Sequence, residues 1–130
     1  MRYDARWTDL PEIEVLPNNF RRSVAGLKTS ANYIRLVHPS GTPLHHHETE
    51  EQMVFMLEGA MEVEVGAETF RLEPGCVCAI PAGVSHCFRS TEQQQNFGWE
   101  DSDAQSVLQF HQLNVYCHWP FLPFFYLESD

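Results

Sequence analysis

The sequence has little positive charge. Of its 130 residues only eight are Lys or Arg, against 18 Asp and Glu, and the formal net charge is -10 at pH 7. Six of the eight lie at or before Arg35 and none follows Arg89. Such a surface would repel a phosphate backbone or an anionic membrane. We therefore expect neither nucleic acid nor a membrane as a partner. A cation that holds an anionic ligand must be a metal, Arg35, Arg71, Arg89 or part of the N-terminal arm.

Long hydrophobic runs are also lacking. Pro or charged residues interrupt the apolar stretches, and residues 1–15 contain no continuous apolar segment of the kind a signal peptide needs. We expect a cytoplasmic protein. Its four cysteines are expected to stay reduced, because a chain of this length without an export signal needs no disulfide framework. Cys76 and Cys78 are expected to be small buried apolar residues, since a metal pair there would have no nearby third ligand.

Helical periodicity is almost absent, and alternation with period two takes its place. Apolar and polar residues alternate in residues 33–37, 61–65 and 107–115, each bounded by turn-forming residues. Residues 52–57 are apolar at nearly every position, which predicts a strand buried on both faces. Frequent Gly and Pro turns separate these segments. The pattern predicts one all-β domain, a sandwich or barrel.

Three regions follow from this pattern. Residues 1–30 are expected to form an N-terminal arm with at most one short strand, residues 31–118 the barrel, and residues 119–130 a tail. Residues 92–106 are polar and predict a loop. The tail has seven large apolar side chains within residues 119–127. Because so much apolar surface is not left exposed, the tail is expected to cover the barrel mouth or to lie in a dimer interface.

The candidate site lies in the segment 44–52, which holds three consecutive histidines. In a strand, His45 and His47 point to the same side and His46 to the other. A further histidine, His86, follows a tight turn at residues 81–83 on a later predicted strand. Two imidazoles facing one way, with a third beside them, suit a metal. The alternative is an exposed, polar histidine-rich loop.

These residues resemble two motifs of the cupin family. The first motif, HxH followed by a carboxylate and a glycine, is matched by His45, His47, position 52 and Gly59. The second, G-x5-P-x-G-x2-H-x3-N, is matched by Gly75, Pro81, Gly83 and His86, with Ser90 in place of Asn. The resemblance covers about residues 31–117. It implies a small antiparallel jelly-roll barrel, one divalent transition metal (zinc, iron, nickel or manganese) and a homodimer.

Two departures from the family pattern matter. The spacing from Gly41 to His45 is two residues shorter than in the family, and enforcing that spacing would make Thr49 a ligand, so His45 and His47 are kept. At the family's glutamate position this chain has Gln52. We expect Gln52 to bind the metal through its amide oxygen together with His45, His47 and His86. Glu51, which points to the other strand face, is the alternative ligand.

A neutral glutamine changes the chemistry of such a site. Three imidazoles and an amide leave the dipositive charge uncompensated, which makes the metal a stronger Lewis acid and disfavours oxidised iron. A site of three histidines and one glutamine is similar to that of small cupins that process unsaturated sugar acids and of cupin-type polyketide cyclases. The resemblance implies a metal-dependent isomerase, lyase or cyclase acting on a small molecule. An iron dioxygenase and a non-catalytic sensor are the alternatives.

Candidate catalytic groups come from the strands. Gln109 and His111 share one strand face, and if that face lines the pocket, His111 is a candidate general acid or base. The alternative is a partly exposed strand histidine. Arg35 could anchor a substrate carboxylate, although a solvent-facing arginine fits the sequence as well.

Overall fold

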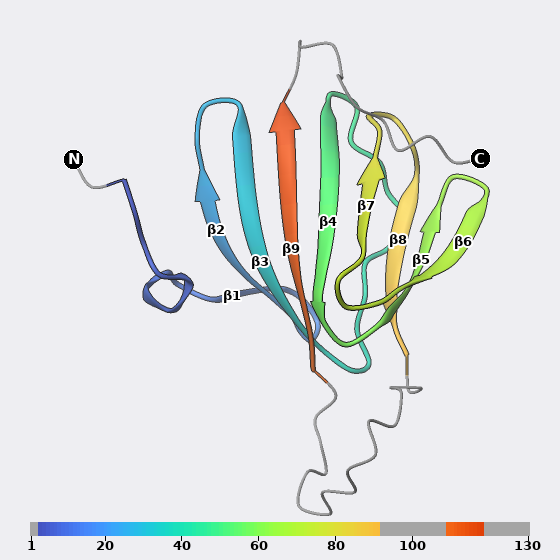
Figure 1. Ribbon diagram of the computed structural model, residues 1–130, viewed down its shortest axis with the longest axis horizontal. Coiled ribbons are helices and arrows are strands. Elements are labelled where there is room, and N and C mark those ends of the chain that lie inside the picture. Colours follow the sequence, from blue (N-terminus) through green and yellow to red (C-terminus); the bar gives the residue numbers. More distant parts are fainter. Residues whose placement is uncertain (1–2, 92–108, 119–130) are drawn as a thin grey trace, which may run out of the picture.

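The protein is built from two antiparallel sheets (Figure 1), and buried residues of both sheets form one hydrophobic core. The computed structural model describes residues 3–91 and 109–118. The larger sheet has the strand order β1-β2-β3-β9-β4-β7 and the smaller one β6-β5-β8. This arrangement confirms the predicted all-β antiparallel jelly-roll class, although the two sheets do not close into a continuous barrel. The strands are β1 (Ile13–Leu16), β2 (Asn19–Ala25), β3 (Thr29–Val37), β4 (Glu50–Glu58), β5 (Met61–Val65), β6 (Glu68–Leu72), β7 (Val77–Ile80), β8 (His86–Ser90) and β9 (Gln109–His118).

The first thirty residues contribute more to the sheet than expected. Two strands, β1 and β2, form there, preceded by a 3-10 turn over Trp7–Asp9. β2 pairs with β3 over its whole length, from Asn19 opposite Leu36 to Ala25 opposite Ser30. The interpretation of this segment as an arm with at most one short strand is therefore wrong. Strand pairing with β3 supplies backbone partners that the local pattern of residues 1–30 did not reveal.

Strand β4 is not buried on both faces. Val54 and Met56 are buried, whereas Met53 and Leu57 are 39% and 49% exposed. The strand thus has an inner face toward the second sheet and an outer face that remains partly accessible. Its nearly continuous apolar sequence led to the wrong prediction, because an apolar run cannot show whether a second layer covers the outer face.

The interior between the two sheets divides into an apolar and a polar part. Phe88, Phe110, Met56 and Met61 lie among the largest fully buried side chains of the apolar core. Along the inner face of β9, Phe110 is followed by the buried amides of Gln112 and Asn114. Oε1 of Gln112 and Oδ1 of Asn114 have no hydrogen-bond partner there, and buried polar atoms of this kind require one.

The connection between β3 and β4 runs alongside the smaller sheet. Gly41 and Arg89 form one isolated bridge, and His45 and His86 form another. A side chain at Gly41 would lie 2.2 Å from the backbone oxygen of Phe88, so only glycine allows this close approach. The bridges hold the histidine-rich segment against the start of β8.

Two predicted segments, the loop at 92–106 and the aromatic tail at 119–130, lie outside the described residues. The part of the chain that is described contains no helix long and apolar enough to cross a membrane.

Candidate functional site

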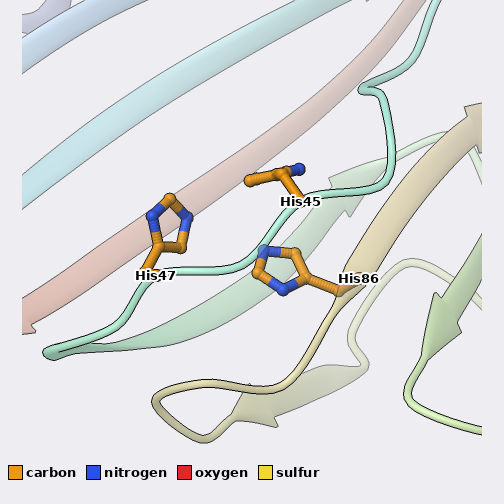
Figure 2. A group of neighbouring side chains, drawn as sticks. All are labelled: His45, His47 and His86. Atoms are coloured by element: carbon orange, nitrogen blue, oxygen red, sulfur yellow. The ribbon is translucent and has the colours of Figure 1, made fainter.

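Three of the predicted site residues come together in space. His45 and His47 lie on the connection between β3 and β4, and His86 lies at the start of β8 (Figure 2). Each offers one ring nitrogen, and the three nitrogen atoms lie within 4.8 Å of one another. The rings of His45 and His86 have their centroids 4.4 Å apart, and those of His47 and His86 5.3 Å apart. This cluster could hold a metal ion.

Backbone carbonyls orient two of the rings. Nδ1 of His45 lies 2.7 Å from the carbonyl oxygen of Pro43, and Nδ1 of His86 lies 2.9 Å from that of Val84. A carbonyl oxygen only accepts hydrogen bonds, so each Nδ1 carries the proton and donates. In the neutral form of each ring, Nε2 is then unprotonated and has a free lone pair. Such second contacts are typical of metal-binding histidines, because they fix both the tautomer and the ring orientation.

The buried polar atoms at the centre lack partners. Nε2 of His47, Nε2 of His86 and Oε1 of Gln52 are all buried without a hydrogen bond. Three buried polar atoms without partners at one place would lower the stability of the fold if nothing bound to them. Imidazole nitrogens with an oxygen donor suit zinc and other divalent transition metals. The residues present therefore fit a metal of this kind.

Burial favours the neutral form of His47 and of His86. It lowers the pKa of His47 below its ordinary value, and the neighbouring His45 lowers it further. Burial likewise lowers the pKa of His86, although the hydrogen bond to Val84 opposes the decrease. A neutral imidazole is the form that binds a metal.

The structure distinguishes Gln52 from Glu51 by position. Gln52 is 2% exposed, faces the interior, and adjoins His47, whose pKa its side chain tends to raise. Glu51 is on the opposite face of β4 and pairs in register with the exposed Cys117. Of these two residues, Gln52 is thus the one placed with the histidines.

A cavity of about 260 Å³ adjoins the cluster. Its walls combine His45 and His47 with other polar groups and with the apolar side chains of Ile34 and Phe88. The lining residues outside the proposed ligands are Arg21, Ser30, Asn32, Ile34, Thr42, Glu50, Phe88, Asn114 and Tyr116. The volume suits a small metabolite, since it lies just below the usual range for drug-sized ligands.

His111 and Gln109 do not line this cavity. On β9 the buried residues are Phe110, Gln112 and Asn114, so the odd-numbered residues face outward. His111 contacts groups of the outer surface: Nδ1 lies 3.0 Å from the Tyr33 hydroxyl and Nε2 lies 3.6 Å from a Glu58 carboxylate oxygen. The Gln109 and His111 face therefore does not line the pocket, and His111 fits the alternative of a partly exposed strand histidine.

Arg35 also points to the outer surface. Its guanidinium forms an ion pair with Glu12, with Nη2 2.6 Å from Oε1, and lies over the Phe20 ring. This pairing raises the pKa of Arg35 and lowers the pKa of Glu12. Arg35 thus ties β3 to the segment before β1, and it does not reach the cavity as a carboxylate anchor.

Arg21 and Tyr116 are among the cavity residues that were not predicted as site residues from the sequence. Arg21 comes from β2, in the region interpreted as an arm. Tyr116 lies on the inner face of β9, and its ring centroid is 5.4 Å from that of His47. The alternation through Gln112 and Asn114 could have indicated Tyr116, because the three share a face. No comparable local signal marked Arg21, since its placement depends on the pairing of β2 with β3.

Comparison with known proteins gives a family and a set of similar folds. Residues 33–97, half of the chain, match the cupin domain family. The structure of KdgF from Halomonas sp. is 20% identical with a TM-score of 0.70, covering 87% of this chain and 90% of that one. An RmlC-like cupin from Shewanella frigidimarina is 13% identical with a TM-score of 0.73, covering 91% and 92%.

A variant of oxalate decarboxylase from Bacillus subtilis is 17% identical with a TM-score of 0.64, covering 86% of this chain but 28% of the enzyme. Comparison with curated protein sequences gives no match. At these identities the structural likenesses support the fold, and the family match rests on the sequence of residues 33–97. Together with the jelly-roll sheets and the histidine cluster, this match shows that the chain belongs to the cupin domain family.

Proposed function

We propose that this protein is a metal-dependent cupin enzyme that acts on a small molecule by non-oxidative proton transfer, as an isomerase, lyase or cyclase. The ligands would be His45, His47, His86 and Gln52. The observation that carries the proposal is a set of buried metal-ligand atoms without hydrogen-bond partners, next to a cavity. These atoms are Nε2 of His47, Nε2 of His86 and Oε1 of Gln52. If the cluster had only a structural role, nothing would offset the free-energy cost of burying these polar atoms without partners.

The donor set favours Lewis-acid chemistry. A divalent metal held by three neutral imidazoles and one amide supplies a positive charge that polarises a carbonyl or hydroxyl oxygen of the substrate. None of the four proposed ligands carries a negative charge that would offset it or favour a higher oxidation state of iron.

The cavity residues supply binding and proton transfer. The amides of Asn32 and Asn114 line the wall and can hydrogen-bond substrate oxygens. The Tyr116 hydroxyl and the Glu50 carboxylate are titratable groups of the same wall, outside the ligand set, and can move a proton at the substrate. We assign the proton-transfer role to these groups in place of His111, which contacts Tyr33 and Glu58 on the outer surface.

The test is turnover by protein loaded with a single metal. The zinc form should convert an unsaturated sugar acid or a polyketide-like substrate under nitrogen, with product followed by proton NMR. Tyr116→Phe should slow this turnover and His111→Gln should not, because Tyr116 lines the cavity and His111 does not. An activity that requires both iron and oxygen would overturn the proposal and assign the protein to the dioxygenases. Stoichiometric metal binding with tight binding of these compounds and no turnover would identify a sensor.

A further inference from the structure

Two consecutive arginines on β2 face opposite sides of the larger sheet. Arg21 pairs in register with the buried Ile34 and lines the cavity. Arg22 pairs with Tyr33 on the outer face, where its guanidinium donates to the carbonyl oxygens of Trp7 and Leu10. Strand alternation thus divides this basic pair between an internal and an external position.

The guanidinium of Arg21 lacks the partners that other arginines have. Its Nε is buried without a hydrogen bond, and the described residues provide it with no ion pair. By contrast, carboxylates pair with Arg22, Arg35, Arg71 and Arg89. Arg21 as a whole is half-buried, and a buried N–H without an acceptor is costly unless a ligand supplies one. Among the residues that the structure describes, Arg21 is also the only Lys or Arg that lines the cavity.

Tyr116 adjoins both Arg21 and the histidine cluster. Its ring contacts that of His47, with centroids 5.4 Å apart. Arg21 and Tyr116 both line the same cavity. A ligand that spans this cavity would have Arg21 near one part and the histidines near another.

We propose that Arg21 binds the carboxylate of a small organic acid whose reacting oxygen lies at the histidine cluster. The proposal specifies the substrate class for the proposed function. Its statement about the reacting oxygen at the histidine cluster rests on that proposed function. Arginine suits this role because its planar donors can hold both oxygens of a carboxylate. With a net charge of -10 the protein as a whole does not attract anions, so selection of an acid depends on a local cation inside the cavity.

The experiment compares two probes of similar size, one with a carboxylate and one with a neutral amide in its place. Pyruvate and pyruvamide are titrated into metal-free and zinc-loaded protein, and binding is followed by NMR through the Nε–H signal of Arg21 and the backbone amides. Pyruvate should move the Arg21 signal and bind about tenfold or more tightly than pyruvamide, as expected for a charge-assisted pair. Equal affinities, or pyruvate binding that leaves the Arg21 signal unmoved, would overturn the proposal.

Variants distinguish a loss of carboxylate binding by Arg21 from a loss of folding or of metal binding. Arg21→Gln should abolish the preference for pyruvate, Arg21→Lys should retain part of it, and Arg22→Gln should leave it unchanged, because Arg22 faces outward. Dispersed amide spectra check folding, and zinc stoichiometry should be the same in all four proteins. A full preference in Arg21→Gln would overturn the anchor. Failure of zinc to bind, with the Arg21-dependent preference intact, would instead overturn the proposed function and leave the carboxylate anchor standing.

Discussion

His45 and His86 are joined through their backbones. The amide nitrogen of His45 donates to the carbonyl oxygen of His86 over 3.1 Å, and that of His86 donates back over 2.8 Å. This reciprocal pair holds the two rings side by side although forty-one positions separate them in the sequence. The bridge therefore positions two proposed metal ligands independently of any ligand, which lowers the cost of ordering the site when a metal binds.

Removal of one ligand should abolish stoichiometric metal binding. His47→Ala eliminates a buried Nε2 that has no protein partner, so zinc per chain should fall from one to near zero at neutral pH. His46→Ala is the matched control, because His46 is exposed and does not line the cavity. Elemental analysis and calorimetric titration measure both. A His47→Ala protein that still holds one zinc would place the site elsewhere.

A charge change at position 52 should tighten metal binding. Gln52→Glu introduces a carboxylate at the buried position beside His47, so zinc affinity should rise by about tenfold or more. Glu51→Gln is the control and should change affinity little, since Glu51 is on the other face of β4. Competition with a chelator gives the dissociation constants. The opposite ranking of the two variants would identify Glu51 as the ligand.

The hydrogen bond between Tyr33 and His111 should contribute to stability and not to the metal site. Tyr33→Phe removes the hydroxyl that lies 3.0 Å from Nδ1 of His111 and should cost ~1 kcal/mol in the free energy of unfolding. In a His111→Gln background the same change should cost less, because the original partner is gone. Urea denaturation of the four proteins forms the cycle. Loss of bound zinc in His111→Gln would contradict the outward placement of this residue.

Acid should weaken the contact between the N-terminal segment and the larger sheet. Arg35 and Arg22 lower the pKa of Glu12 below its ordinary value of 4.5. In the folded protein Glu12 stays ionised where the unfolded chain already binds a proton, so its contribution to stability is present above pH 4.5 and is lost as the pH falls through the lower folded pKa.

The measurement for Glu12 is the free energy of unfolding as a function of pH. Glu12→Gln should have a lower free energy of unfolding than wild type at pH 6. This difference should become smaller as the pH drops below 4.5. Glu14→Gln removes an exposed carboxylate on β1 and should follow the wild-type pH dependence. If the difference in free energy of unfolding between wild type and Glu12→Gln is constant from pH 6 to pH 3, the ion pair of Glu12 does not make a pH-dependent contribution to stability.

Local patterns in the sequence determined the fold class and the histidine cluster. Alternation with period two predicted the strand at Met61–Val65 with its observed bounds and most of β3. The HxH spacing and the turn before His86 predicted that three imidazoles would meet, and their ring nitrogens lie within 4.8 Å. These features are local or depend on short turns, so the order of residues alone is sufficient to indicate them.

The tertiary structure decided which side of each strand is inside. On β9 the half-buried Leu113 and Val115 face outward and the amides of Gln112 and Asn114 face inward, the reverse of the usual apolar core pattern. Alternation shows that two faces exist but not which one meets the second sheet. Pairing of β2 with β3 likewise brings Arg21 to the cavity, while Arg35 and His111 are directed to the outer surface. The cavity and its charge depend on contacts between distant strands, and for that reason only the folded chain shows them.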